Sequence, residues 1–202
     1  QYEDILIGRK IQHATAVGGL LELQVGDAKL VFSDGVNLRY FQAGSKRPIK
    51  HQLLLELEDE SALCASVQMY GGLSCYPKGE EETSSYYMVA KSKPSPLSKE
   101  FDEAYFEVIS SAKEVQKLSV KAFLATEQRI PGLGNGVLQD ILWTAKLHPK
   151  RKMNTLSGEE RAVMFRSIKD VLLAMTKAGG RDTEKNLFGV AGGYETAMSR
   201  NH

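Results

Sequence analysis

A glycine-rich stretch from Gln128 to Gly136 holds the residues whose types and spacing best suit contact with an anion. Gly132 and Gly134 allow the backbone to turn tightly and to bring amide groups close to a ligand. A helix predicted from about residue 137 to 145 would aim its free N–H groups and its dipole at the same place. Asn135 adds a neutral donor that suits a phosphate oxygen. The alternative is a plain turn between helices, which a Gly-x-Gly pattern alone would favour.

Local charge favours the phosphate interpretation. Between Ser119 and Met153 only Glu127 and Asp140 oppose six cations, which leaves a charge of +4: Lys121, Arg129, Lys146, Lys150, Arg151 and Lys152. The formal net charge of the whole chain is only +1, so overall charge by itself does not indicate nucleic acid. A solvated helix end is the alternative explanation for the cluster.

The elements that must position this stretch fall into two kinds, which meet near residue 98. Short apolar runs separated by turn residues predict an antiparallel β-sandwich or barrel over residues 1–91. The predicted strands cover residues 20–25, 29–32, 53–57 and 62–69, and Gly26-Asp27 and Asp34-Gly35 lie in the turns. A Pro-Ser-Pro segment at 94–96 then connects to a helical domain over residues 92–202. We therefore expect an α+β fold.

Apolar spacing places the helices of the second half. Ser98 and Phe101 are expected to begin a helix that carries Tyr105, Val108 and Ile109 on its apolar face. A short helix follows at 120–125. Further along, Ser157 and Glu160 form a capping box that opens a long helix, which Gly179 and Gly180 end.

Composition limits the cellular setting. The 202 residues contain no apolar run of the roughly 18 residues that a membrane helix needs, and the first residues carry no signal-peptide pattern. We expect a cytoplasmic monomer. Cys64 and Cys75 are too few for a disulfide scaffold or a four-cysteine zinc site, and we expect both in the core.

Four segments, in order and spacing, resemble the formamidopyrimidine-DNA glycosylase and endonuclease VIII family. Residues 124–135 and 145–151 are similar to its helix–two-turn–helix, with the Gly-x-Gly-Asn turn and the His-Pro-x-Arg exit. Residues 94–101 resemble its interdomain segment, and residues 179–183 resemble the Gly-Gly segment after its long helix. The resemblance is closer to the bacterial endonuclease VIII-like branch.

The resemblance implies roles for individual residues. Asn135 and Lys121 would contact the DNA backbone near the lesion, with Gly132 and Gly134 shaping the turn between them. Val36 on one loop, and Gln68 with Tyr70 on another, would fill the space left by a flipped base and lower the cost of its unstacking. The implied partner is double-stranded DNA that contains damaged bases or abasic sites.

Three departures from the family bear on catalysis. The family begins with a proline nucleophile and a glutamate, whereas this sequence begins Gln1-Tyr2-Glu3-Asp4, which resembles a point about forty residues into the family. Its catalytic residues are therefore unknown from this sequence. The family also carries a four-cysteine zinc finger beyond the position of His202, so a structural zinc is expected only if such a finger follows. Val17 stands where many members have a hairpin lysine.

Three hypotheses follow. The first is a glycosylase with AP lyase activity on oxidised bases, of which these residues form the DNA-binding body. The second is a non-catalytic remnant that binds damaged or abasic DNA. The third is a helix-hairpin-helix glycosylase, because residues 130–134 also fit that hairpin, although the β-rich first half argues against it. Purine and pyrimidine lesions both remain open as substrates, with a slight preference for pyrimidines.

Overall fold

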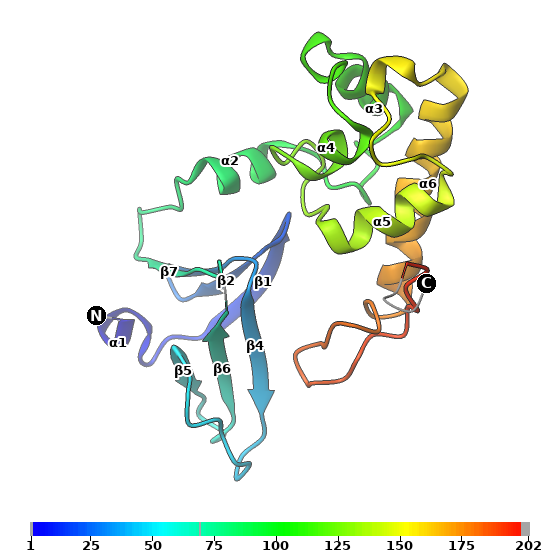
Figure 1. Ribbon diagram of the computed structural model, residues 1–202. Coiled ribbons are helices and arrows are strands. Elements are labelled where there is room, and N and C mark those ends of the chain that lie inside the picture. The colour runs from blue at the N-terminus through cyan, green and yellow to red at the C-terminus, as the bar shows by residue number, and fades with distance from the viewer. Residues whose placement is uncertain (1, 69, 199–202) are drawn as a thin grey trace.

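The computed structural model describes residues 2–68 and 70–198, and it has an α+β fold in which antiparallel sheets precede a helical part (Figure 1). Seven strands lie within the described residues: β1 (Ile11–Val17), β2 (Leu20–Val25), β3 (Ala28–Phe32), β4 (Val36–Phe41), β5 (Leu53–Glu56), β6 (Ala62–Val67) and β7 (Leu73–Tyr76). The helices are α1 (Tyr2–Leu6), α2 (Ser85–Ser92), α3 (Glu103–Ser111), α4 (Val120–Ala125), α5 (Asn135–Thr144) and α6 (Gly158–Lys177), with 3-10 turns η1 (Lys113–Val115) and η2 (Met153–Thr155).

The strands form the predicted sandwich. One sheet has the order β1-β2-β3-β7 and the other β4-β6-β5, and every pairing is antiparallel. The two sheets enclose a core to which the larger contributes Leu23, Leu30 and Phe32, and the smaller Leu53 and Leu63. Because successive side chains on a strand point to opposite faces, Val31 lies on the outer face of the larger sheet.

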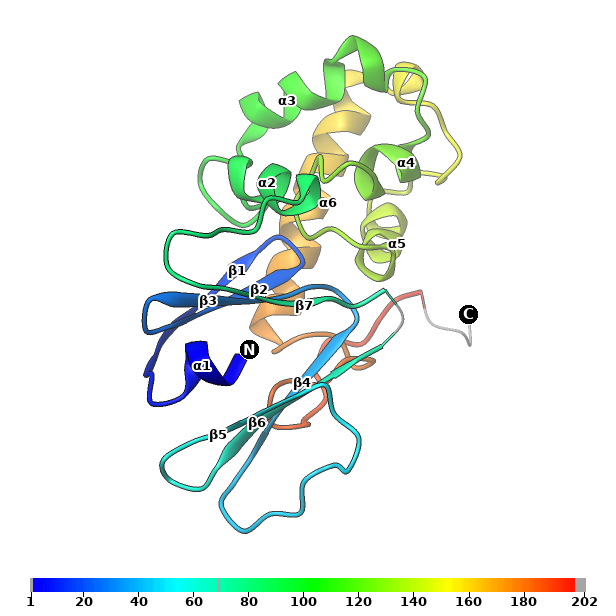
Figure 2. The ribbon, with the colours of Figure 1, turned by 90° about the vertical axis from the view of Figure 1, so that its left-hand side faces the viewer.

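Helix α2 covers that outer face, as Figure 2 shows. Tyr87 and Ala90 of α2 pack on Leu20 and Val31, and the Tyr87 hydroxyl donates to the Glu22 carboxylate at 2.6 Å. The sequence did not predict a helix here, because so short a helix with only two core residues shows no clear apolar repeat at a spacing of three to four. The Ser84 side chain, which accepts from the Tyr87 amide, caps its N-terminus.

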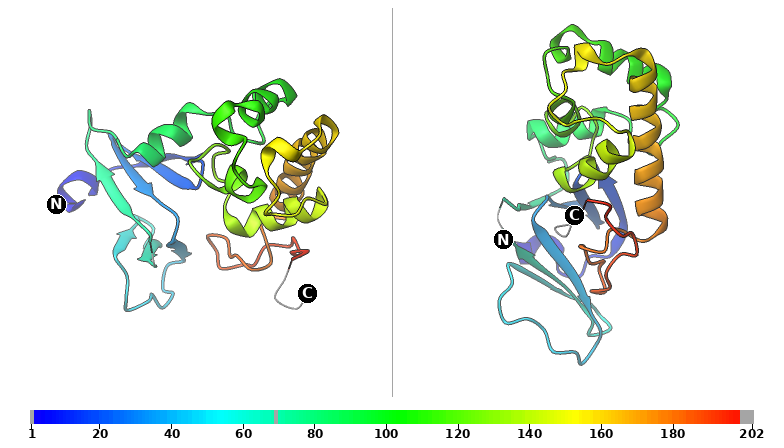
Figure 3. Two further views of the ribbon diagram at one scale, coloured as in Figure 1. Left: turned by 45° about the horizontal axis from the view of Figure 1, so that its top comes forward. Right: turned by 45° about the vertical axis from the view of Figure 1, so that its right-hand side comes forward.

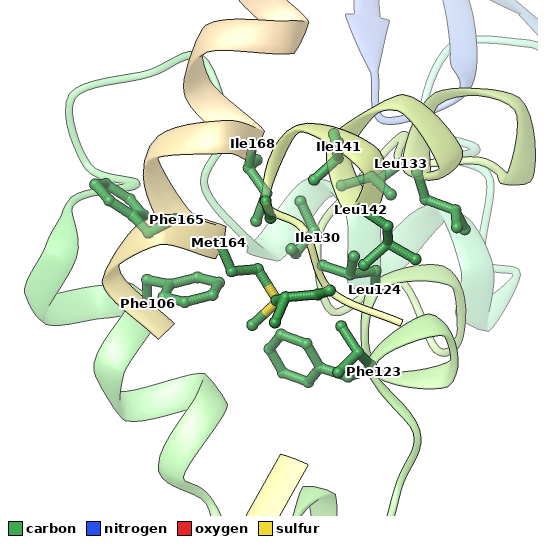
Figure 4. Close-up of a cluster of buried hydrophobic side chains, with 14 of the residues drawn as sticks. Phe106, Phe123, Leu124, Ile130, Leu133, Ile141, Leu142, Met164, Phe165 and Ile168 are labelled. Atoms are coloured by element: carbon green, nitrogen blue, oxygen red, sulfur yellow. The ribbon is translucent and has the colours of Figure 1, made fainter. Parts of the chain in front are cut away.

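The helical part packs around a second core (Figure 4). Helix α6 crosses α3 and α5 and inserts Met164, Phe165 and Ile168 between them. The first predicted helix needs correction. It begins at Glu103 and not at Ser98, because the Asp102 side chain caps its first turn. Phe101 is buried but lies in the connecting segment before the helix. Val108 faces solvent and is 70% exposed.

The long helix begins and ends as predicted. The Ser157 side chain accepts from the Glu160 amide, and the Glu160 carboxylate accepts from the Ser157 amide at 2.9 Å, which completes the capping box. Beyond its last residue, Gly179 and Gly180 have φ angles of 73° and 107°, which favour glycine. No helix among the described residues is both long and apolar enough to cross a membrane.

The β part and the helical part lie next to each other (Figure 3), and contacts from both the turn before α5 and the segment after α6 connect them. Gly18, in the turn between β1 and β2, lies against Gly132, so that a Cβ built on Gly132 would be 2.9 Å from the Gly18 carbonyl carbon. The segment after α6, residues 181–198, returns to β4, where the Tyr40 amide donates to the Leu187 carbonyl at 2.9 Å. Phe188 packs edge-on against the Tyr40 ring.

Candidate nucleic-acid interface

The turn before α5 presents free amides at its exposed face. Helix α5 begins at Asn135, and Gly134, in extended conformation, is its N-cap and makes no side-chain cap bond. Among the described residues, the amides of Asn135 and Gly136 have no backbone acceptor. The Asn135 side chain is exposed and does not cap the helix, because Asn135 is the first helical residue and not the residue before it. The turn therefore offers the amides and the side-chain donor expected of an anion site.

Polar contacts, some of them partly buried, hold this turn in shape. Glu127 and Gln128 both have positive φ angles, 58° and 48°. The Gln128 side chain accepts from the Gly132 amide at 3.2 Å. The backbone carbonyl of Gln128 accepts from Lys93 Nζ at 3.0 Å. Arg129 donates to the Thr126 side chain and pairs with Glu127 at 2.6 Å. Arg129 thus has a structural role within the turn.

Lys121 lies at the second position of α4, with its side chain exposed. Its backbone amide donates to the Pro149 carbonyl at 3.1 Å, and the Val120 amide donates to the Arg151 carbonyl at 2.8 Å. Ser119 caps α4 by accepting from the Ala122 amide. These bonds dock the His-Pro-x-Arg exit on the start of α4 and fix where the Lys121 stem leaves the helix.

The basic cluster is smaller than the sequence suggested. Arg151 forms a bidentate pair with Glu160, and Arg129 pairs with Glu127. The bond from Arg151, together with the Ser157 amide, lowers the pKa of Glu160 to about 2. The cations of the cluster whose side chains are exposed and form no ion pair with another described residue are Lys121, Lys146, Lys150 and Lys152.

The two loops predicted to fill a base-sized gap lie side by side. The Gln68 amide donates to the Gly35 carbonyl at 2.7 Å, and Gly71 lies so close to Gly35 that a Cβ there would be 2.7 Å from its carbonyl. Gln68 is exposed. Tyr70 is 94% exposed and has a φ of 67°, which is unusual for an aromatic residue. Val36, in contrast, is half-buried and packs on the sandwich core. Met69, the predicted end of the β6 strand, lies outside the described residues.

The Asp34 carboxyl group lies between the β1–β2 turn and the segment after α6. A Cβ built on Gly19, in the β1–β2 turn, would be 3.0 Å from an Asp34 carboxylate oxygen. Burial, with a smaller contribution from Glu184 of the segment after α6, raises the pKa of Asp34. The β1–β2 turn, the loop after β3 and the segment after α6 therefore come together at one place.

Arg181, which the sequence did not single out, lies against the start of α5. Its guanidinium lies directly over Gly136, where any Cβ would collide with it, and it pairs with Glu184. Its Nε is buried without a hydrogen-bond partner among the described residues. The glycine at position 136 leaves room for this guanidinium, but the sequence contains no pattern that connects Gly136 with Arg181, because the two lie far apart along the chain.

Comparisons with known proteins agree with this arrangement. The family model "Formamidopyrimidine-DNA glycosylase H2TH domain" matches residues 93–186, which contain α4, the turn and α5. The chain is 27% identical to the formamidopyrimidine-DNA glycosylase of Lactococcus lactis over 89% of its own length and 65% of the relative's. It is 28% identical to that of Streptococcus agalactiae over 93% of its length and 68% of the relative's.

The chain is therefore similar to formamidopyrimidine-DNA glycosylases over most of its length, and its helical part matches the H2TH domain of that family.

Solved structures of formamidopyrimidine-DNA glycosylases share its fold. The MutM (Fpg) protein of Thermus thermophilus superposes with a TM-score of 0.75 at 23% identity, over 92% of this chain and 69% of that one. The Lactococcus lactis Fpg bound to DNA with an abasic site gives a TM-score of 0.77 at 23% identity, over 95% and 70%. The chain spans about two thirds of the length of these proteins, and 65% of the first two curated relatives. The β-sandwich before the helices separates it from helix-hairpin-helix glycosylases.

The described residues offer no set of ligands for the zinc that the family resemblance implies. Among the described residues, no group of three or more His, Cys, Asp or Glu side chains could hold a metal ion. Cys64 lies in β6 and Cys75 in β7, in different sheets, and burial raises the pKa of both thiols. Both cysteines therefore suit small packing roles in the sandwich.

Proposed function

We propose that the protein is a base-excision repair DNA glycosylase with AP lyase activity on oxidised bases, and that residues 1–202 bind its duplex DNA substrate. The observation that carries the proposal is the start of α5, where the amides of Asn135 and Gly136 have no acceptor among the described residues and the Asn135 side chain is exposed, within a part of the sequence that is rich in exposed lysines. Helix N-termini with such free amides favour phosphate. The family's DNA complexes, such as the Lactococcus lactis Fpg with abasic-site DNA, support the same partner.

The contacts proposed for Asn135 and Lys121 are to phosphates, so they position the duplex without reading its sequence. Damage would be recognised through distortion, because a flipped base costs less to extrude at a weakened site. Tyr70, Gln68 and Val36 are the proposed gap-filling residues. Tyr70 suits that role best, because its ring is exposed, whereas Val36 would have to leave core contacts.

The chemistry itself is assigned to no residue of this sequence. The Pro-Glu pair that the family resemblance connects with excision and strand cleavage is not among these residues. We accordingly propose that residues 1–202 bind the DNA. The covalent step would need a form of the protein that contains the Pro-Glu pair. A monomer acting in the cytoplasm, with a zinc finger if one follows His202, completes the proposal.

A non-catalytic binder of damaged or abasic DNA is the second candidate, favoured by Val17 at the place of the family's hairpin lysine. Borohydride trapping on abasic DNA separates the two. We expect no adduct with residues 1–202 and an adduct with a protein that begins with Pro-Glu. An adduct with residues 1–202 would mean that another amine, such as that of Lys121, serves as nucleophile.

Substrate choice can be measured directly. Solved complexes of the Lactococcus lactis Fpg contain a Fapy-dG lesion in one case and an oxidised pyrimidine in another. We propose that oxidised bases of either class are accepted, with a slight preference for pyrimidines. A set of duplexes that each carry one lesion, tested for excision by the complete enzyme, ranks the two classes.

The phosphate contacts give the main test. Asn135→Ala should weaken binding to an abasic-site duplex by about 1–2 kcal/mol, the usual size for a lost hydrogen bond to a charged group. Lys121→Ala should weaken it comparably and lower the log–log salt slope by about one. Since both side chains are exposed, neither change should move the melting temperature. Titrations at two or more salt concentrations, with a thermal melt of each variant, measure all three quantities.

Lys113→Ala is the control, because Lys113 is exposed in η1, outside the turn before α5, the basic cluster and the segment that contacts Gly136. It should leave both affinity and salt slope unchanged. If Asn135→Ala lowers stability while DNA affinity stays the same for both test variants, the turn is a structural connector and the proposed interface is wrong.

A further inference from the structure

A cavity of about 600 Å³ lies beside the proposed DNA contacts, between α4, α5 and the segment that follows α5. Its apolar wall is formed by Leu138, Leu142, Trp143, Leu147, Pro149 and Met198. This volume falls within the range of pockets that hold small ligands. Nothing in the proposed binding of a duplex accounts for an apolar cavity at this position.

Hydrogen bonds, one set of them to a buried carboxylate, hold the walls in place. The Asp140 carboxylate, 1% exposed, accepts from the amides of Ala197 and Met198 at 3.0 and 3.1 Å, which fastens Met198 across α5. On the other side, the Lys121 amide donates to the Pro149 carbonyl at 3.1 Å. The cavity is therefore a built feature of the fold and not a gap between loose side chains.

The chemistry of the lining is aromatic and cationic. Trp143 is 64% exposed, so a large indole face is available to a ligand. Lys121, Lys146 and His148 also line the cavity, and no carboxylate of a described residue belongs to its lining. An aromatic face beside two ammonium groups is complementary to a flat ring that carries a strongly negative group.

We propose that this cavity binds a nucleotide, with its base stacked on Trp143 and its phosphate held by Lys121 and Lys146. Any of the bases can stack on an aromatic side chain. A phosphate, which carries more negative charge than a carboxylate, suits a site with two ammonium groups. The nucleotide has two possible sources, a free mononucleotide or an unpaired residue of a DNA strand. This site extends beyond the proposed duplex contacts, although it shares Lys121 with them.

Trp143 is the only tryptophan of the chain, so its fluorescence reports on this cavity alone. Deoxyadenosine 5′-monophosphate should quench it saturably, and deoxyadenosine without the phosphate should bind at least about tenfold more weakly, the change expected for one lost charge-assisted contact. A single-stranded tetranucleotide identifies the source. Binding tighter than that of the mononucleotide points to a DNA strand, and equal or weaker binding points to a free nucleotide; either result supports the site.

Variants locate the phosphate. Lys146→Ala should lower the affinity for the mononucleotide roughly tenfold, the size expected for one lost charge-assisted contact. Lys150→Ala is the matched control, because Lys150 is exposed in the same segment but does not line the cavity, and it should leave the affinity for the mononucleotide unchanged.

Two outcomes overturn the proposal. One is the absence of saturable quenching by either nucleotide probe. The other is equal affinity in Lys146→Ala and Lys150→Ala, with both variants folded as judged by their melting curves. The fluorescence measurement uses no abasic duplex. A failure of the proposed duplex contact at Asn135 would therefore leave this result unchanged, and a failure of the nucleotide site would leave duplex binding unchanged.

Discussion

Gly132 shows how a single residue couples the DNA-facing turn to the β-sandwich. Its φ of 78° lies in the left-handed region, and the space where a Cβ would stand is filled by the Gly18 backbone. Either feature alone would favour glycine. Together they allow the turn before α5 to rest directly on the β1–β2 turn, so the position of Asn135 depends on two glycines in different parts of the chain.

Replacing Gly132 should therefore be costly. Gly132→Ala is expected to lower the free energy of unfolding by about 2–3 kcal/mol, from left-handed strain and from overlap with the Gly18 carbonyl. Gly158→Ala is the control, because Gly158 opens α6 with no atom within 4 Å of a built Cβ. It should be neutral or stabilise by up to about 1 kcal/mol. Urea unfolding of both variants measures this, and equal stabilities would contradict the close approach.

At the scale of elements, the start of α6 supports the start of α4. Glu160 completes the capping box of α6 and also pairs with Arg151. The carbonyl of Arg151 in turn accepts from the Val120 amide at the N-terminus of α4, next to Lys121. A helix cap thus fixes the exit segment on which the proposed phosphate contact rests.

This arrangement predicts a pH dependence. The pKa of Glu160 lies at about 2, below its ordinary value of 4.5, so its charge stabilises the fold above that ordinary value. The contribution is lost as the pH falls from 4.5 towards 2. Glu160→Gln can keep the capping box but not the charge. Its melting temperature should fall below that of the unchanged protein at neutral pH, and the gap should close in acid. A gap that stays constant with pH would show that the charge does not contribute.

At the scale of the whole molecule, the segment after α6 ties the helical part to the smaller sheet. Strand β4 is an edge strand, and the outward Tyr40 amide finds its acceptor in the Leu187 carbonyl. The Asn186 side chain accepts from the Phe188 and Val190 amides, which shapes the tip that presents Phe188 to the Tyr40 ring. The connection uses few contacts, and it should open more easily than either core.

Phe188→Ala tests this connection. Loss of an aromatic pair worth about 0.5–1.5 kcal/mol should speed hydrogen exchange of the Tyr40 amide roughly three- to tenfold. Amides of the central strand β6 should exchange as before and serve as the internal control. Exchange that rises equally in β6 would mean that the change lowers global stability and does not open this contact alone.

Local sequence was enough to predict the features that depend on neighbouring residues. Glycine spacing and the apolar repeat placed the turn before α5, and Ser157 with Glu160 placed the start of α6. Alternating apolar runs with turn residues predicted the antiparallel sandwich. Each of these depends on backbone preference or on contacts within one helical turn, which a short window of sequence contains.

Tertiary structure alone decided which distant residues meet. It placed Arg181 over Gly136, brought the Gly35 and Gly71 loops together, and fastened Met198 across α5 to close a cavity beside Trp143. It also paired Arg129 and Arg151 with carboxylates, which removed two cations from the predicted basic cluster. These contacts arise from how the two cores pack and which surfaces that packing leaves uncovered. No local preference encodes that result, because the free energy of such contacts exists only once the chain has folded.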